Sequence, residues 1–220
     1  MENSGFLPIF IRATGLKVLV IGGGKVGSKR ALKFANYGSR VTVISLDVSK
    51  ELLENKENLD IVIYDARNLS EEFLKRFDII VTATNDKSLN ENLCTNVKKL
   101  RKLCNNPTNV ENSSFIFPIF YDNNEVEVAI TTFGKSSLTA KLILNRILNI
   151  INEKNIKNLL NVMGDVKKIL KERIKDPSKR FKIYQVIFND PLFERFIFEG
   201  DKFKAFKRAE EIISEYSRRD

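Results

Sequence analysis

The stretch KVLVIGGGKVGSKRA, residues 17–31, decides the fold of this 220-residue chain. Lys17 is followed by four aliphatic residues, which predict a buried strand, and residues 26–37 predict a helix. Between them, Gly22, Gly24 and Gly27 fit the pattern GxGxxG. Between a strand and a helix, this pattern is typical of a dinucleotide-binding βαβ unit; a purely structural glycine turn is the alternative.

Each position of the glycine loop has a physical reason in such a site. Gly22 permits the tight turn, Gly24 lets the backbone approach a pyrophosphate, and Gly27 allows the helix to pack closely on the strand. The helix dipole and the free N–H groups of its first turn, beginning at Lys25 and Val26, favour an anion there. We therefore expect these five residues to bind the cofactor's pyrophosphate.

The second predicted strand, residues 41–44, bears on the choice of cofactor. The fingerprint places an acidic residue at its end to hold the adenosine ribose, and here Ser45 and Leu46 precede Asp47. Asp47 is expected in the loop after the strand, where it either reaches the ribose or caps the helix near Ser49. No arginine directly follows the strand to bind a 2′-phosphate, which favours NAD over NADP. We assign Ser45, Leu46 and Asp47 to the cofactor site.

Strand and helix patterns continue to alternate, which predicts an α/β, Rossmann-like, doubly wound parallel sheet. Further strands are expected at residues 60–64 and 78–83, and further helices at residues 49–55, 70–76 and 90–102. Ligands bind at the carboxyl edge of such sheets, so Thr84 and Asn85 are expected beside the cofactor. Helix capping by Asp86 or Ser88 is the alternative for this segment.

The second half of the chain has a different pattern. After the polar segment 105–112, residues 115–121 and 126–132 predict a β-hairpin, with Pro118 at an edge or bulge. Apolar residues at helical spacing follow from Ser137 to the C-terminus. We expect an NAD-binding domain (1–112), a hairpin-and-helix region (113–150), and a helical C-terminal domain (151–220).

The composition narrows the function classes. With 37 basic and 28 acidic residues the net charge is +9, which favours an acidic partner such as nucleic acid, an anionic membrane or a polyanionic small molecule. The chain contains no histidine, so the commonest general base and the usual zinc ligands are missing. No apolar run is long enough to span a membrane. We expect a cytoplasmic protein in which Cys94 and Cys104 are reduced.

The assembled pattern resembles the precorrin-2 dehydrogenase family, the first module of siroheme synthase, whose members can also act as sirohydrochlorin ferrochelatase. The resemblance covers roughly residues 6–150. The motifs that carry it are PIF (8–10), VLVIGGGKVGSKRA (18–31), VTATNDKSLNENL (81–93), SFIFPIF (114–120) and VAITTFGKSSLTAKLI (128–143). The last two are the most specific, because they are not general Rossmann features. The resemblance implies a homodimer that oxidises precorrin-2 to sirohydrochlorin with NAD. It also implies that residues 113–150 form the dimerisation and active-site region.

The resemblance also implies the substrate contacts. Precorrin-2 is a polycarboxylate, so a basic cleft would attract and orient it. Lys135 and Ser136, in the motif that leads into the long helix, are the expected substrate-binding residues. Lys141 and Arg146 are further candidates; an ordinary solvated helix surface is the alternative for all of these cations.

One departure from the family pattern concerns the catalytic position. The family's NVVD element carries an Asp proposed as the general base, and counting back seven residues from Phe115 places Thr108 there, followed by Asn109. We assign the catalytic position to Thr108 and Asn109, although neither accepts a proton as a carboxylate does. The sequence therefore predicts a dehydrogenase with weak or absent chelatase activity, in which Asp122 or Glu111 could replace the missing base.

Two other function classes fit parts of the chain. A nucleotide-sensing regulatory module of the potassium-transport type shares the glycine loop, but it predicts an acidic residue where Ser45 ends the second strand. A redox-sensing repressor fits the positive charge, yet only 16 residues precede the first strand, too few for an N-terminal winged helix. A C-terminal helix-turn-helix is a further alternative. We expect neither nucleic acid nor a membrane as partner.

Overall fold

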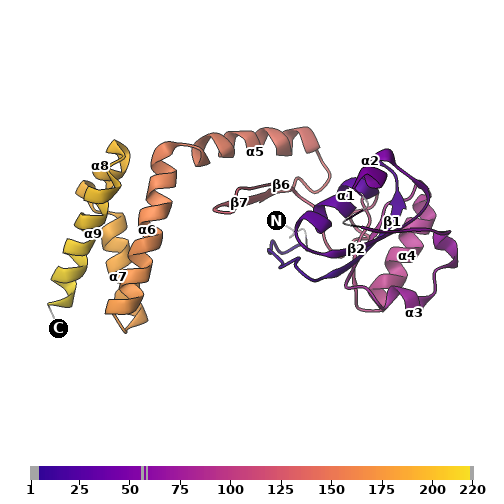
Figure 1. Ribbon diagram of the computed structural model, residues 1–220, viewed down its shortest axis with the longest axis horizontal. Coiled ribbons are helices and arrows are strands. Elements are labelled where there is room, and N and C mark those ends of the chain that lie inside the picture. The colour runs from indigo at the N-terminus through magenta and orange to yellow at the C-terminus, as the bar shows by residue number, and fades with distance from the viewer. Residues whose placement is uncertain (1–4, 56, 58, 219–220) are drawn as a thin grey trace. The chain divides into compact units, whose positions relative to one another are not determined.

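The computed structural model describes residues 5–55, 57 and 59–218 (Figure 1). The chain forms two compact units, residues 1–140 and 141–220. The three-region division expected from the sequence, which concerns function as well as packing, stays a prediction. None of the helices in the described part is long and apolar enough to cross a membrane.

The first unit is built on a parallel sheet with the strand order β3-β2-β1-β4-β5. The strands are β1 (Lys17–Gly23), β2 (Arg40–Val48), β3 (Asp60–Ile63), β4 (Ile79–Thr82) and β5 (Leu103–Asn105). In the centre, Val20 of β1 pairs with Val43 of β2 and with Val81 of β4. The strand order reverses between β1 and β4, and ligands of doubly wound sheets bind at such a switch point. The predicted fold class is confirmed.

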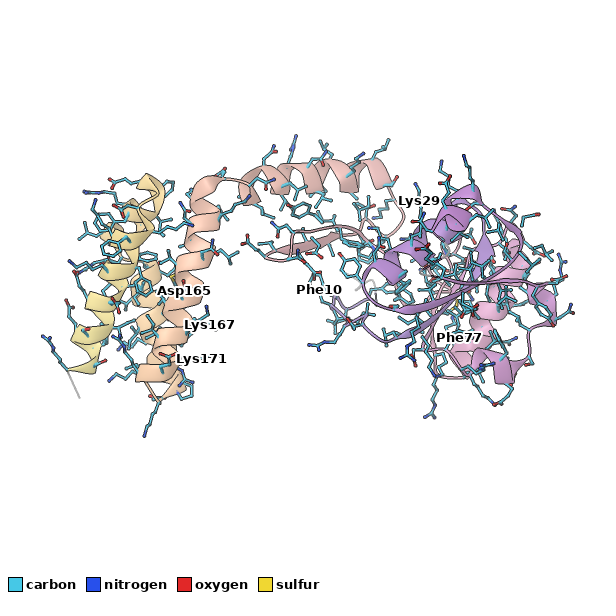
Figure 2. The ribbon with its side chains drawn as sticks, viewed as in Figure 1. Phe10, Lys29, Phe77, Asp165, Lys167 and Lys171 are labelled. Carbon is cyan, nitrogen blue, oxygen red and sulfur yellow. A yellow bond between two sulfur atoms is a disulfide. The ribbon has the colours of Figure 1, made fainter. Side chains whose placement is uncertain are left out.

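Helices cover both faces of this sheet, because successive residues of a strand point to opposite sides. Val18 and Val20 of β1 face one apolar cluster with Phe34 of α1 (Lys25–Asn36), to which α2 (Lys50–Glu54) adds Leu52. Leu19 and Ile21 face the other, which α3 (Glu71–Leu74) and α4 (Lys87–Lys99) cover with Leu74, Leu93 and Val97. Phe77, labelled in Figure 2, belongs to the second cluster. The carboxyl ends of the strands are thereby held rigidly.

The structure corrects several predicted boundaries. β2 runs to Val48, so Asp47 lies inside this strand and not in the loop after it. α4 begins at Lys87 because the Asp86 carboxylate accepts a hydrogen bond from the Leu89 N–H at 3.0 Å. It ends at Lys99, three residues before the predicted end, and β5 occupies residues 103–105, of which Asn105 was predicted to begin the polar segment.

The hairpin is shorter than predicted. It consists of β6 (Ile119–Asp122) and β7 (Glu127–Ile130), so it begins only after Pro118. The preceding residues leave the strand pattern because Phe117 packs edge-on against Phe34 of α1, with ring centroids 5.5 Å apart. Aromatic packing on α1 therefore overrides the strand propensity of this segment.

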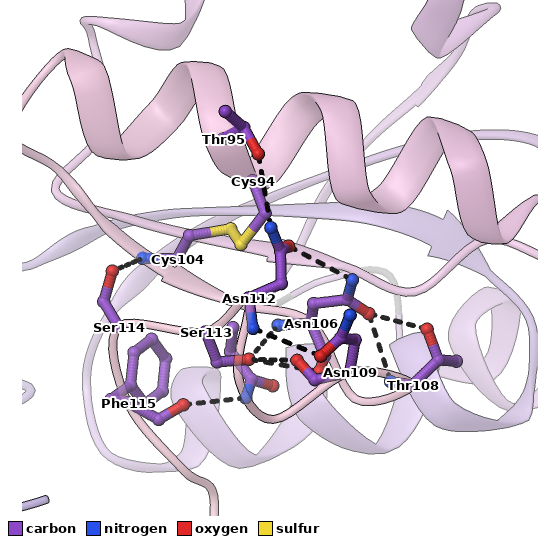
Figure 3. Close-up of a disulfide and its surroundings, with 11 residues drawn as sticks. Cys94, Thr95, Cys104, Asn106, Thr108, Asn109, Asn112, Ser113, Ser114 and Phe115 are labelled. Carbon is purple, nitrogen blue, oxygen red and sulfur yellow. Dashed lines mark hydrogen bonds between the residues drawn. A yellow bond between two sulfur atoms is a disulfide. The ribbon is translucent and has the colours of Figure 1, made fainter. Parts of the chain in front are cut away.

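Cys94 and Cys104 form a disulfide, which contradicts the expectation that both are reduced (Figure 3). Packing of α4 on β5 brings their Cα atoms to 5.5 Å, a usual separation for a disulfide. Both residues are fully buried in the apolar cluster of α3 and α4. The expectation of a cytoplasmic location, which used these cysteines, stays a prediction.

Removing this disulfide should destabilise the first unit. The bridge closes a loop with a sequence separation of 10, for which chain entropy gives about 2–3 kcal/mol. We expect the double variant Cys94→Ala, Cys104→Ala to melt about 5–10 °C lower by calorimetry. Dithiothreitol should lower the Tm of the wild type and leave that of the double variant unchanged. Equal melting of all four samples would show that the bridge contributes nothing.

The second unit is helical, as predicted. α5 (Ser137–Ile151) joins the two units, and α6 (Lys154–Arg173), α7 (Pro177–Phe188), α8 (Pro191–Glu199) and α9 (Lys202–Ser217) pack around one apolar core. Pro177 and Pro191 each occupy the first turn of a helix, after the caps Asp176 and Asp190. Arg208 of α9 pairs with Asp190 at 2.8 Å and holds the pKa of that carboxyl below its ordinary value.

Candidate functional site

Two glycines of the GxGxxG motif are required for the turn from β1 into α1. Gly22 has φ +111°, and a Cβ on it would lie 2.4 Å from the Ala83 carbonyl oxygen. A Cβ on Gly27 would lie 1.8 Å from the Gly22 carbonyl oxygen, so a side chain there would push α1 off β1. These positions behave as the GxGxxG pattern predicts.

Gly24 has a different role. A Cβ at this position would meet nothing within 4 Å, and its φ of −74° is open to any residue. It is the N-cap of α1, with no side-chain cap and no acidic residue in the first turn. The N–H groups at the start of α1 therefore meet an open surface, which is the cradle that a phosphate requires. On this observation the residues present fit a dinucleotide.

Serine side chains fix the shape of this loop. The Ser45 hydroxyl accepts a hydrogen bond from the Gly23 N–H at 2.8 Å and donates one to the Asp47 carbonyl at 2.6 Å. The hydroxyls of Ser28 and Ser49 lie 2.7 Å apart, and Ser28 also bonds the Gly24 carbonyl at 2.8 Å. Ser45 thus ties the end of β2 to the glycine loop. Sequence reasoning missed Ser28 and Ser49 in this role.

A cleft of about 430 Å³ lies at the carboxyl ends of the central strands. Its lining includes seven of the predicted cofactor residues: Gly22, Gly24, Ser45, Leu46, Asp47, Thr84 and Asn85. The lining does not include the predicted residues Lys25, Val26 and Gly27, which form the first turn of α1 behind Gly24. The structure therefore brings the loops after β1, β2 and β4 together around one space.

The loop after β4 is held by hydrogen bonds to the side-chain amide of the buried Asn90. The Asn90 Oδ1 accepts from the Thr84 N–H at 3.1 Å and from its hydroxyl at 2.7 Å, while the Asn90 amide donates to the Thr84 carbonyl at 2.9 Å. Asp86 caps α4, and the hydrogen bonds from the Leu89 N–H and the Ser88 hydroxyl lower its pKa. Asn85 remains exposed at the cleft.

The segment after β3 also lines the cleft, which the sequence did not indicate. Tyr64, Asp65, Ala66 and Arg67 contribute to the wall. The Arg67 guanidinium lies 3.5 Å from the carboxylates of both Asp65 and Asp86. Arg67 lies far from the glycine motif along the chain, so the sequence does not predict it at the cofactor site. The crossover after β3 brings it to this edge of the sheet.

The predicted catalytic residues lie in a hydrogen-bonded loop after β5 (Figure 3). The Thr108 hydroxyl donates to the Asn106 Oδ1 at 2.7 Å, and the Asn109 amide donates to Glu91 at 2.9 Å. The buried Ser113 hydroxyl bonds the backbone of both Asn106 and Asn109. Thr108 and Asn109 do not line the cleft, and their catalytic role stays a prediction.

A second hollow of about 540 Å³ borders the same loop. It is lined by Gly5, Phe6, Val110, Glu111, Ser113, Ser114 and Phe133. Lys135 and Ser136 follow Phe133 in a turn that the Thr132 hydroxyl bonds at 3.0 and 3.1 Å. Glu111 lines this hollow, whereas Lys135 and Ser136 are not among its lining residues, and their substrate-binding role stays a prediction. Asp122 does not line the hollow, because its carboxylate accepts from the Tyr37 hydroxyl at 2.8 Å on the hairpin.

The comparisons agree with this site. A family model described as "Putative NAD(P)-binding" matches residues 9–119. A "Putative precorrin-2 dehydrogenase" of Methanocaldococcus jannaschii is 36% identical over 194 residues, 85% of this chain and 92% of that relative. A siroheme synthase of Psychromonas ingrahamii is 28% identical over 96% of this chain, but only 44% of the synthase is covered. This chain thus spans less than half the length of that synthase.

A solved structure named "SirC, precorrin-2 dehydrogenase" has a TM-score of 0.67 and 21% identity, and the match covers 94% of this chain and all of that one. This likeness supports the fold alone. The glycine loop, the cleft at the switch point and the identity to the Methanocaldococcus relative together settle the assignment. The chain therefore belongs to the NAD-dependent precorrin-2 dehydrogenase family.

Proposed function

We propose that this chain oxidises precorrin-2 to sirohydrochlorin, with NAD as the hydride acceptor. The single observation that carries this proposal is the open Gly24 cradle at the switch point, in a chain 36% identical to a relative named for this activity. The substrate loses a hydride and a proton, and the products are sirohydrochlorin, NADH and H⁺. NAD supplies the hydride-accepting chemistry when it is bound.

The residues around the cleft have distinct tasks toward the cofactor. The first turn of α1, with Lys25 and Val26, supports a pyrophosphate at Gly24, since its N–H groups carry the positive end of the helix dipole. Asp47, at the end of β2, serves the adenosine ribose. Thr84 and Asn85 border the cleft from β4. Gly27 keeps α1 close enough to β1 for this arrangement.

The second hollow suits a polycarboxylate substrate. Lys135 and Ser136 follow Phe133 of its lining, and the exposed Lys135 can attract carboxylate groups of precorrin-2. Lys141 and Arg146, both exposed on α5, are further candidate partners for these carboxylate groups. Because the hollow also contains Phe6 and Phe133, it offers apolar surface to the macrocycle.

Glu111 is the residue that we propose as proton acceptor. Among the residues that line the second hollow, it is the one carboxylate, and none of the described residues forms an ion pair with it. The Thr108 hydroxyl donates a hydrogen bond to Asn106, and the Asn109 amide donates one to Glu91. Asp122, the other carboxylate considered from the sequence, bonds Tyr37 and lies outside the hollow. Chelatase activity stays weak or absent in this proposal.

A homodimer completes the proposal. α5 exposes Leu138 by 80%, Leu142 by 53% and Ile150 by 57%, and these belong to the apolar stripe that the sequence shows. The N-terminal segment likewise exposes Leu7 and Phe10. Large apolar side chains exposed in this way are typical of a protein interface, and a second copy of the chain is the proposed occupant.

An activity assay tests the proposed function. Purified protein is mixed with NAD and precorrin-2, and NADH absorbance and the sirohydrochlorin spectrum are followed together. We expect equal amounts of NADH and sirohydrochlorin, with no acceleration of metal insertion when ferrous or cobaltous ion is added. Failure to oxidise precorrin-2 would refute the proposed function. Rapid metal insertion would refute the inference drawn from Thr108.

A further inference from the structure

Arg67 is placed at the cofactor cleft by the crossover that follows β3. The Tyr64 N–H donates to the Ser45 carbonyl at 3.2 Å, and the Asp65 carboxylate accepts from the Arg67 N–H at 3.0 Å. Between them, Ala66 is buried against the apolar cluster that contains Ile21. These contacts fix a short 3₁₀ turn, Ala66–Asn68, at the carboxyl edge of the sheet, and Arg67 lines the cleft from it.

The guanidinium of Arg67 is held, but only weakly. It spans from Asp65 after β3 to Asp86 after β4, at 3.5 Å from each carboxylate, and its side chain is 61% exposed. Strong charge-assisted hydrogen bonds are 2.7–2.9 Å long, and exposed ion pairs contribute little to stability. The fold therefore does not depend on these pairs, which orient the guanidinium at the cleft.

The flat face of this guanidinium is available for stacking. Arg30, Arg76 and Arg195 each lie over a phenylalanine ring, at 4.0, 5.6 and 5.6 Å from its centroid. No aromatic ring covers Arg67 within the described part of the chain. A guanidinium plane stacks well on a neutral aromatic ring, including a nucleobase.

The charge around Arg67 selects the kind of ligand. Asp65 and Asp86 contribute two negative charges against its one positive charge, and Asp47 lines the same cleft. The net negative charge here would repel a 2′-phosphate, whereas it would not repel a neutral planar ring. In folds of this kind the adenosine half of the cofactor binds on the side of β2. The end of β2 carries Asp47, and the segment after β3 is tied to this part of the strand by the Tyr64–Ser45 hydrogen bond.

We propose that Arg67 stacks on the adenine ring of NAD and that its two carboxylate partners disfavour NADP. This inference rests on the proposed function, since it requires a dinucleotide in the cleft. It assigns a specificity-determining role to a residue outside the glycine motif.

Binding of cofactor fragments, measured by calorimetry, tests the proposal without any activity assay. Arg67→Met should weaken ADP-ribose binding about tenfold, as loss of base stacking does, and change nicotinamide mononucleotide binding less than twofold. Arg67→Lys should also lose affinity, because lysine keeps the charge but not the plane. 2′-Phospho-ADP-ribose should bind more weakly than ADP-ribose to the wild type. Arg76→Met, which removes an arginine outside the cleft lining, is the matched control and should bind like the wild type.

The outcomes distinguish failure of the proposed function from failure of the inference about Arg67. A wild type that binds neither ADP-ribose nor NAD would refute the proposed function. A wild type that binds ADP-ribose as tightly as Arg67→Met or Arg67→Lys does would refute this inference alone. A loss confined to 2′-phospho-ADP-ribose would make Arg67 a phosphate ligand, which also overturns it. Unchanged melting of both Arg67 variants should accompany the expected result.

Discussion

Replacing Gly24 with leucine is expected to abolish NAD binding while the protein still folds. A Cβ at this position meets nothing within 4 Å, and φ −74° with ψ −176° is extended backbone open to any residue, so the chain tolerates the side chain. The leucine instead fills the cradle at the start of α1, where the phosphate would approach the N–H groups. We expect affinity for NAD to fall at least about a hundredfold, a change of about 2.7 kcal/mol, by calorimetry.

Two other glycines provide the controls for this variant. A Cβ on Gly164 of α6 also meets nothing within 4 Å, so Gly164→Leu should leave NAD affinity and melting nearly unchanged. Gly27→Leu should instead unfold the first unit, since its Cβ would lie 1.8 Å from the Gly22 carbonyl oxygen. If Gly24→Leu bound NAD as tightly as the wild type, the cofactor would have to bind at a site other than the start of α1.

The parts of the fold that the sequence predicted are those with a strong local pattern. β1, the glycine loop and α1 were predicted within two residues at each end, because the aliphatic run, the glycines and the helical spacing lie next to one another. Gly22 and Gly27 were predicted for the correct reasons, since backbone geometry alone demands them. Such features need no knowledge of distant contacts.

The features that the sequence did not reveal depend on contacts between distant segments. β5 has only three residues and is a strand because it pairs with β4, as Cys104 does with Ile80. The disulfide follows from that pairing, since α4 and β5 bring Cys94 and Cys104 together. Arg67 reaches the cofactor cleft only through the crossover after β3. Glu111 was a candidate base from the sequence, but its place in the second hollow depends on the fold of the loop after β5. No local spacing in the sequence encodes these contacts between distant segments.

Replacing Glu111 with glutamine is expected to remove most of the dehydrogenase activity. The variant keeps the size of the side chain but cannot accept a proton, and a positioned general base contributes about 10²–10⁴ in rate. We expect kcat for precorrin-2 oxidation to fall about a hundredfold, while the Kd for NAD stays unchanged because Glu111 lies outside the cofactor cleft. Steady-state kinetics and calorimetry on the same preparation measure both quantities.

A control carboxylate distinguishes a base from a residue that merely shapes the hollow. Glu111→Gln keeps the shape of the side chain and removes its ability to accept the proton. Asp122→Asn is the control carboxylate, since its pKa is already lowered by the Asn124 N–H and the Tyr37 hydroxyl and it lies outside the hollow. It should retain activity within about twofold. If Asp122→Asn lost the activity and Glu111→Gln kept it, the proton acceptor would be the hairpin carboxylate; if both variants kept it, the proton would pass to water without help from either side chain.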